Sequence, residues 1–229
     1  MVKERVAIFV ATYNQADTFL PKCLEYIKNQ TYKNFICVVG DDHSKDKTYK
    51  VVEDLNDRRF VYHYNEKKYG QGLGFYNWAV RKYTNRYFCI CDGDNYLYPE
   101  SVEKRLREIS KGYSAVYGYG VNVDYSNMDN PVIMYTRERK WDINDYIYGS
   151  SYNNYIDGSD IMFRRSSFIK AGGFYEGKEY QDYSVMVRIA ITSNNNISYV
   201  PQVLAQHNNH SKCVSYSSAN THKAHINIF

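Results

Sequence analysis

Short apolar runs that alternate with amphipathic segments fill the first 112 residues, and this alternation constrains the fold more than any other feature. The runs cover residues 5–11, 35–39, 60–64 and 87–91. In the segments between them, apolar residues recur at spacings of three and four, which predicts helices with one buried face. Strands that alternate with helices indicate a doubly wound, mostly parallel sheet with helices on both faces. We therefore expect an α/β domain.

The second half of the chain has a less regular pattern. It predicts strands at residues 115–123, 132–136, 161–163 and 197–200, and helices at residues 166–171 and 179–192. We expect a small additional sheet in this half. No repeat or linker divides the sequence, which predicts a single domain over residues 1–229. Residues 207–229 lack periodicity and are expected to form a flexible lid or tail.

Composition excludes several classes of protein. The chain has 229 residues, of which 29 are basic and 25 acidic, and a net charge of +4. This charge is too small to favour a nucleic-acid partner, and no basic block is present. No apolar run reaches the roughly 18–20 residues that cross a membrane. Five cysteines, an odd number without a zinc-binding spacing, favour free thiols in a reducing compartment. We expect a cytoplasmic protein without a transmembrane segment, with peripheral membrane association as the alternative.

Two carboxylates, those of Asp92 and Asp94, follow directly after the fourth run and are separated by Gly93. Acids this close repel one another unless a cation or a proton lies between them. Carboxylate oxygens suit Mg²⁺ or Mn²⁺, which often take further ligands from water and from a substrate phosphate. The pattern therefore suggests a site for a metal ion and a diphosphate. The alternative is an ordinary Asp-Gly turn.

Polar residues also follow the first and second runs. Thr12, Tyr13 and Asn14 end the first run, and Asp41 and Asp42 end the second. The carboxyl ends of parallel strands meet at one edge of a sheet, where ligands bind in open α/β folds. We therefore expect these residues to lie beside the acids that follow the fourth run. A turn that caps the next helix is the alternative for the two aspartates.

Three glycines, Gly70, Gly72 and Gly74, precede the third predicted helix. Their spacing is not that of a phosphate-binding loop, and they do not follow directly from a strand. We interpret them as a flexible entry to the helix that carries Asn77, which we include among the candidate nucleotide-binding residues.

Several segments resemble, in order, the motifs of family 2 glycosyltransferases with the GT-A fold. The family's opening is similar to VAIFVATYNQADTFLPKCLEYIKNQTYKNFICVVGDDHSKDKT, and its D-x-D segment is similar to CDGDNYLYPESVEK. Its arginine–helix–glycine segment is similar to FRRSSFIKAGGFYEG, and its acidic helix to EYQDYSVMVRIA. The resemblance extends to about Arg188 and is specific, because several motifs occur together at the family's usual spacing.

The resemblance implies a role for each candidate residue. Asp182 would be the catalytic base, and Asp94 the main metal ligand. Further ligands to Mn²⁺ or Mg²⁺ would be His210 and, more weakly, Asp92 and His207. The alternative for both histidines is a position on the surface without a metal. The nucleotide would contact Thr12, Tyr13, Asn14, Asp41, Asp42, Asn77, Asp92 and Gly93. The donor or acceptor sugar would contact Gly158, Ser159, Asp160 and Gln181.

The sequence departs from the family's pattern at three places. Asn95 and Gln181 occupy positions where the family often has acids. No arginine lies within QHNNHSKC, where the family often has an arginine–histidine loop. These departures concern the metal site and the surroundings of the base.

The expected function is metal-dependent, inverting transfer of a sugar from a nucleotide diphosphate, with UDP favoured, to a glycan, lipid or protein acceptor. Residues 1–112 would hold the nucleotide and residues 113–206 the acceptor. One alternative is a sugar-nucleotide nucleotidyltransferase, which would carry a loop rich in Gly, Arg and Lys where this chain has ATYNQADTFLPK. The other is a non-catalytic nucleotide- or carbohydrate-binding module, against which the presence of both Asp94 and Asp182 argues.

Overall fold

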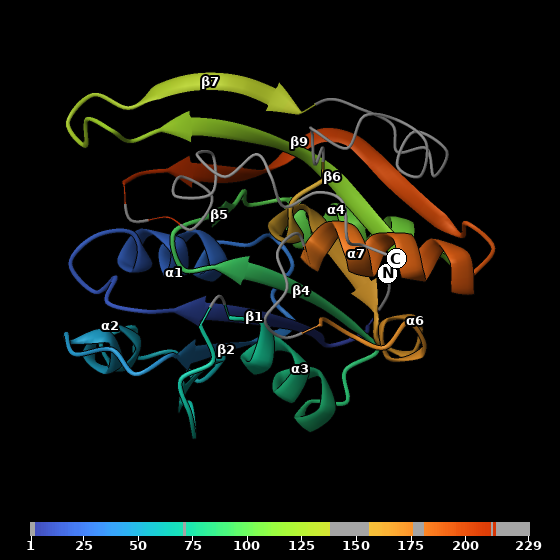
Figure 1. The fold of residues 1–229 in the computed structure, drawn as a ribbon, viewed down its shortest axis with the longest axis horizontal. Coiled ribbons are helices and arrows are strands. Elements are labelled where there is room, and N and C mark those ends of the chain that lie inside the picture. The colour runs from blue at the N-terminus through green and yellow to red at the C-terminus, as the bar shows by residue number, and fades with distance from the viewer. Residues whose placement is uncertain (1–2, 71, 138–155, 176–180, 212, 214–229) are drawn as a thin grey trace.

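A computed structural model describes residues 3–70, 72–137, 156–175, 181–211 and 213. Its strands form one nine-stranded sheet in the order β3-β2-β1-β4-β8-β6-β9-β5, with β7 paired to β6 (Figure 1). The strands are β1 Val6–Thr12, β2 Phe35–Asp41, β3 Phe60–Tyr64, β4 Tyr87–Asp92, β5 Tyr96–Leu97, β6 Ala115–Asp124, β7 Val132–Arg137, β8 Ile161–Arg164 and β9 Ile197–Asn209.

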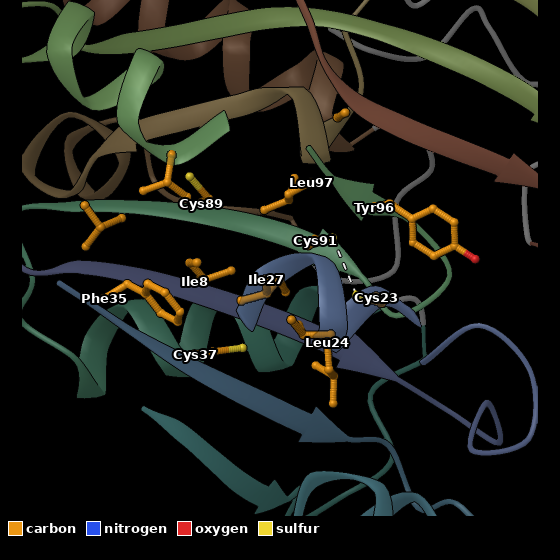
Figure 2. Close-up of a cluster of buried hydrophobic side chains, with 14 of the residues drawn as sticks. Ile8, Cys23, Leu24, Ile27, Phe35, Cys37, Cys89, Cys91, Tyr96 and Leu97 are labelled. Carbon is orange, nitrogen blue, oxygen red and sulfur yellow. Dashed lines mark hydrogen bonds between the residues drawn. The ribbon is translucent and has the colours of Figure 1, made fainter. Parts of the chain in front are cut away.

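Helices cover both faces of this sheet, as the alternating pattern predicts. Along β1, Val6, Ile8 and Val10 point to one face, while Ala7 and Phe9 point to the other. The first face packs on α1 Leu20–Lys28, α2 Thr48–Glu53 and α4 Ser101–Ile109 (Figure 2). The second face packs on α3 Leu73–Lys82, α6 Arg165–Lys170 and α7 Gln181–Thr192.

The first four strands are parallel and end together. In the register, Thr12 lies opposite Asp41, and Ala11 lies opposite Asp92. The polar residues that follow β1, β2 and β4 therefore meet at one edge of the sheet, as expected.

Among the described residues, the strands of the second half join the main sheet and do not form the expected small additional sheet. β8 pairs antiparallel with both β4 and β6, so it bridges the two halves. β6 then pairs parallel with β9 and antiparallel with β7. A sheet edge left by β4 exposes backbone N–H and C=O groups, and β8 satisfies them directly.

The last strand is longer than the sequence predicts. The pattern places a strand at residues 197–200, and residues from 207 in a flexible tail, but β9 continues to Asn209. Its polar end pairs with β6 from Gln206 opposite Val121 to Asn209 opposite Asp124. His207 and Asn208 in this end are buried and have polar partners, which hydrophobic periodicity does not reveal. Residues 214–229 lie outside the described part of the chain.

No helix among the described residues is both long enough and apolar enough to span a bilayer.

Candidate active site

A tight turn after β4 presents Asp92 and Asp94. The amide of Asn95 donates to the Asp92 carbonyl at 2.9 Å, and the amide of Gly93 donates to the Ala11 carbonyl at 2.8 Å. A Cβ atom on Gly93 would lie 2.4 Å from Gln15 Oε1, so a side chain here would displace the neighbouring loop. Glycine thus allows the turn to pack closely against β1. Asp92 directly precedes this glycine and Asp94 directly follows it.

Four acids from three parts of the chain converge near this turn. Burial among protein atoms and then the charges of Asp94, Asp157 and Asp182 raise the pKa of Asp92 to about 7. A hydrogen bond of 2.7 Å from the Tyr76 hydroxyl acts in the opposite direction. Asp92 remains exposed to solvent, so the repulsion between carboxylates is the more important cause. Asp94 and Asp182, 88 positions apart in the sequence, therefore belong to one site.

Asp94 faces the predicted metal ligand His210. Nε2 of His210 lies 3.0 Å from Oδ2 of Asp94, and its ring stacks on Phe19 with the centroids 4.5 Å apart. Asn208, also at the end of β9, donates its side-chain amide to the Asp94 carbonyl. No group of three or more His, Cys, Asp or Glu residues in the described ranges has the arrangement of a complete metal site. The Asp94–His210 pair fits a Mg²⁺ or Mn²⁺ ion that takes further ligands from water and a substrate phosphate.

The residues after β1 lie at the same edge of the sheet. Thr12 is buried and donates its hydroxyl to Gln15 Oε1 at 2.8 Å. Tyr13 is exposed, and its ring lies under Lys68 Nζ, 4.0 Å from the ring centroid. The lysine lowers the pKa of the Tyr13 hydroxyl through a hydrogen bond and its charge. Tyr13 and Asn14 are thus both exposed at this edge of the sheet, whereas Thr12 is buried.

Asp41 and Asp42 are buried, and both carboxylates have protein partners. Asp41 accepts from the Ser44 amide at 2.8 Å and from the Tyr62 hydroxyl at 2.7 Å. Burial and the Asp41 carboxylate raise the pKa of Tyr62. Asp42 accepts from Asn65 and from two backbone amides at residues 69 and 70. In this structure both acids hold loops in place beside the site.

Asn77 is not brought to the acids. Its side chain is buried on α3, where it donates to the Phe174 carbonyl at 2.8 Å and accepts from the Phe174 amide at 3.0 Å. Its neighbour Tyr76 is the residue of α3 that reaches the site, through its hydrogen bond to Asp92. Helix phase decides which of these two adjacent residues points to the sheet edge. The nucleotide contact expected at Asn77 stays a prediction.

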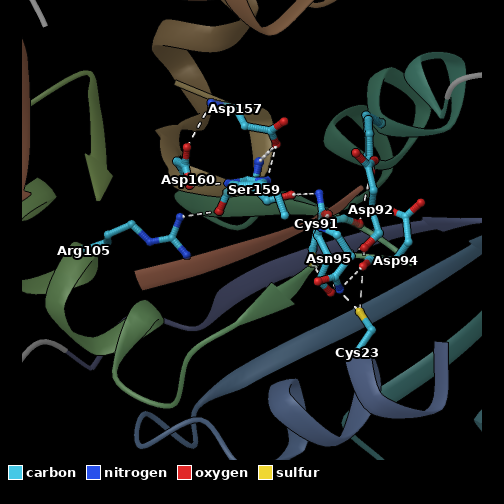
Figure 3. Close-up of polar contacts among 12 residues, drawn as sticks. Cys23, Cys91, Asp92, Asp94, Asn95, Arg105, Asp157, Ser159 and Asp160 are labelled. Atoms are coloured by element: carbon cyan, nitrogen blue, oxygen red, sulfur yellow. Dashed lines mark hydrogen bonds and ion pairs between the residues drawn. The ribbon is translucent and has the colours of Figure 1, made fainter. Parts of the chain in front are cut away.

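The segment before β8 contains the residues expected to contact a sugar. Gly158, Ser159 and Asp160 form a short 3₁₀ helix, η1, and all three are buried. Ser159 accepts from the side chain of Asn95 at 3.1 Å, which ties η1 to the turn after β4 (Figure 3). Its carbonyl accepts from Arg105 at 3.0 Å. These buried residues therefore support the turn after β4 from the interior of the protein.

His207, expected as a weaker metal ligand, lies elsewhere. Its Nε2 is 2.8 Å from Oδ1 of Asp160, and its Nδ1 is 3.3 Å from Oδ1 of Asp157. Burial disfavours a charge on this imidazole, but the two carboxylates outweigh that effect and raise the pKa of His207 to about 10. His207 is thus a buried cation beneath η1, three residues from the ring that contacts Asp94.

Asp182 lies in the first turn of α7 and is partly exposed. A Cβ atom on Gly158 would lie 4.0 Å from Asp182 Cβ, which places η1 next to this turn. The side chain of Gln181, predicted to contact a sugar, lies outside the described residues. The positively charged end of a helix favours an ionised acid at this position.

The fold and this grouping of acids define the class of protein. The structure superposes on that of TarS from Staphylococcus aureus in complex with UDP-GlcNAc, with a TM-score of 0.70 and 16% identity, over 90% of this chain and 58% of that one. It also superposes on a mannosyltransferase from Pyrobaculum calidifontis in complex with GDP-Man and Mn²⁺, with a TM-score of 0.67 and 18% identity, over 90% and 57% of the two chains. The architecture is that of the GT-A fold.

Sequence comparison then identifies the family. The profile described as "Glycosyl transferase family 2" matches residues 7–172, and the chain belongs to this family. It is 28% identical over 124 residues to the Escherichia coli protein named UDP-Glc:alpha-D-GlcNAc-diphosphoundecaprenol beta-1,3-glucosyltransferase WfaP, which covers 53% of this chain and 49% of that protein. It is 29% identical over 117 residues to the GalNAc(5)-diNAcBac-PP-undecaprenol beta-1,3-glucosyltransferase of Campylobacter jejuni, over 50% and 37%. The chain thus spans half or less of the length of these relatives.

Proposed function

We propose that the chain transfers a sugar from a UDP-sugar to an acceptor hydroxyl, with inversion at the anomeric carbon and with Asp182 as the general base. The single observation that carries this proposal is the convergence of Asp182 with Asp92 and Asp94. A glycosyl transfer by direct displacement needs a base that accepts the proton of the incoming alcohol and, on the opposite side of the sugar, a means of holding the departing diphosphate. Membership of the family supports the same reaction.

The expected donor is a UDP-sugar because two relatives bear names of glucosyltransferases, one of them with UDP-Glc in its name. The TarS structure similar to this fold contains UDP-GlcNAc. The exposed ring of Tyr13 and the ammonium group of Lys68 supply an aromatic surface and a positive charge for the nucleotide. The expected acceptor is a lipid-linked glycan, because both named relatives act on undecaprenol-diphosphate-linked sugars.

The chemistry of the chain's own residues follows from their positions. Asp182 would remove the proton from the acceptor hydroxyl as the oxygen attacks the anomeric carbon, while the bond to the diphosphate breaks. One displacement inverts the configuration. Asp94 and His210, with Asp92 beside them, would hold Mn²⁺ or Mg²⁺. A divalent cation at this place neutralises charge on a diphosphate leaving group. The turn at Gly93 keeps Asp92 and Asp94 in place before substrates arrive, which reduces the ordering that the reaction needs.

The proposal is tested by measuring UDP release from UDP-glucose with purified protein, Mn²⁺ and a synthetic lipid-diphosphate GlcNAc acceptor. Product NMR with an α-linked donor reports the anomeric configuration. We expect acceptor-dependent release of UDP and a β-linked product. Release of UDP and retention of configuration would overturn the inverting mechanism. In a parallel assay with added pyrophosphate, conversion of UDP-glucose to UTP and glucose 1-phosphate would identify a nucleotidyltransferase instead.

A further inference from the structure

Asp157, directly before η1, is the side chain of this segment that is open to a ligand. Its side chain is 29% exposed, whereas Ser159 and Asp160 are each 1% exposed. A sugar hydroxyl can reach only a group that solvent can reach. In this structure the buried pair is closed to a sugar, while the carboxylate two residues before Ser159 is accessible.

The carboxylate of Asp157 is fixed before any ligand binds. Its Oδ1 accepts from the Ser159 amide at 3.0 Å and lies 3.3 Å from Nδ1 of His207. The Asp157 amide donates to Asp160 Oδ2 at 3.0 Å, which completes a reciprocal cap of η1. Nε2 of His207 contacts the other oxygen of Asp160, so one buried imidazole joins both carboxylates.

The space around His207 leaves this arrangement little freedom. A Cβ atom on Gly120 of β6 would lie 2.6 Å from both His207 Nε2 and Asp160 Oδ1. The bare backbone of β6 therefore closes the ion pair from one side. His207 itself is 4% exposed. A carboxylate held by a buried cation and a backbone amide keeps its direction when a ligand arrives.

Asp157 also belongs to a segment that adjoins the expected base and the turn after β4. A Cβ atom on the next residue, Gly158, would lie 4.0 Å from Asp182 Cβ, and Ser159 accepts from Asn95 at 3.1 Å. The sugar of a bound donor must lie between the diphosphate side and the base. Hexose hydroxyls donate well to carboxylates, in hydrogen bonds stronger than those between neutral groups.

We propose that Asp157 accepts hydrogen bonds from hydroxyl groups of the transferred sugar, and that His207 is the positioning residue that holds it. This inference rests on the proposed function. It assigns the recognition of the sugar ring to a residue separate from the cation pair Asp94–His210 and from the base Asp182. The sugar epimer that the enzyme accepts would thus depend on the Asp157 carboxylate, which His207 of β9 holds in position.

Binding measurements separate recognition of the sugar from recognition of the nucleotide. UDP-glucose, UDP-galactose, UDP-GlcNAc and GDP-mannose are each compared with the free nucleotide by calorimetry in Mn²⁺. The sugar nucleotide that the wild-type protein binds best is then used with Asp157→Asn, which keeps the shape of the side chain. We expect the Kd for that sugar nucleotide to rise about 10-fold or more, in line with loss of a hydrogen bond to a charged group. The Kd for the free nucleotide should stay within about 2-fold.

His207→Gln should produce the same selective loss, and Asp54→Asn, which changes an exposed acid directly after α2, should produce none. Equal weakening of the free nucleotide and the sugar nucleotide by Asp157→Asn would indicate a structural role and overturn the proposal. An unchanged sugar-nucleotide Kd with a raised KM for the acceptor would also overturn it. If the wild-type protein binds none of these probes, the proposed function itself fails, which is a different result from loss in the variant alone.

Discussion

At the scale of single residues, the site is defined by acids that repel one another. Asp92, Asp94, Asp157 and Asp182 act on the same small region, and the pKa of Asp92 rises to about 7 in response. Such a concentration of like charge costs stability unless a ligand or cation offsets it. Sites that bind substrates often carry this cost, because the charged groups that bind the ligand repel one another when the ligand is absent.

Asp182→Asn should lower the turnover number by about 10²- to 10⁴-fold, because an amide cannot take the acceptor proton. The Kd for UDP should change by less than about 2-fold, since Asp182 is assigned no contact with the nucleotide. Single-turnover kinetics and calorimetry measure the two quantities. The exposed acid of Asp54, directly after α2, provides a control, Asp54→Asn. Parallel losses of turnover and UDP affinity would contradict the role of a base.

Asp94→Asn should weaken the response to divalent cations. In the presence of UDP, Mn²⁺ is expected to raise the melting temperature of the wild-type protein, because a ligand that binds only the native state stabilises it. The variant should show a much smaller rise, since one of the two paired ligand groups has lost its charge. Differential scanning fluorimetry with and without EDTA measures the effect. An equal rise in both proteins would place the ion elsewhere.

Part of the candidate site could be predicted residue by residue, and part could not. Asp94 lies beside His210, and Asp182 lies near enough to act on Asp92; the end of a strand and the start of a helix indicated where the two acids lie, and the roles of all three residues stay predictions. Whether a carboxylate is free depends on distant partners: Tyr62, 21 residues away, occupies Asp41. Asp157 was not among the expected residues, because exposure within a run of polar residues depends on packing around η1.

At the scale of secondary-structure elements, Asn77 illustrates how one side chain can connect two elements. Its amide group makes both hydrogen bonds with the backbone of Phe174, after α6. Gly173, with a φ of +70°, allows the chain to turn there, and a side chain on it would meet Asn77 Oδ1 at 2.7 Å. The link therefore fixes α3 to the connection between α6 and α7, which also positions Tyr76 beside Asp92.

Asn77→Ala should lower the free energy of unfolding by about 1–3 kcal/mol, because it leaves buried backbone groups of Phe174 without partners. The Kd for UDP should remain nearly the same. Urea denaturation and calorimetry measure the two effects. The matched control is Asn85→Ala, which removes one exposed hydrogen bond to the Arg5 carbonyl and should cost much less. A large loss of UDP affinity without loss of stability would restore the nucleotide-binding role expected from sequence.

The elements themselves follow the sequence where periodicity is strong. The four parallel strands and α1, α3 and α4 occur where apolar spacing predicts them, because that spacing reflects burial on one face or both. β5 has only two residues, and the end of β9 is polar, so neither has a periodic signal. Both are formed by pairing with strands far away in the sequence, which local pattern cannot report.

At the scale of the whole molecule, the buried ion pair of His207 connects β9 to η1 across the bare backbone of β6. The pKa of His207 is raised to about 10 by Asp157 and Asp160, against the effect of burial. A raised pKa means that the folded state binds the proton more tightly than the unfolded state does. The resulting stabilisation is complete below about pH 6.5 and is lost as the pH rises towards about 10.

His207→Gln should therefore destabilise the protein most at low pH. Removing one partner of a buried pair costs about 3–5 kcal/mol, and the difference from wild type should shrink steadily between about pH 6.5 and pH 9.5. Urea denaturation of both proteins at several pH values measures this difference, in which titrations common to both cancel. A difference that is independent of pH would show that His207 is not charged in the folded protein.

The place of β9 in the chain has a consequence for biosynthesis. His207 and Asn208 lie in this strand, and His210 follows it directly. The strand lies between β6 and β5, although it is the last strand along the described part of the chain. Tyr98 and Gln206, in contact beside β5, are 108 residues apart. Until β9 has been synthesised, the backbone groups of β5 and of the side of β6 that later pairs with β9 have no partner in this sheet. Unpaired strand edges favour association with other nascent chains. Asp94 thus lacks its contacts with Asn208 and His210 until residue 210 has been synthesised, which would delay the proposed sugar transfer until nearly the whole described chain is present.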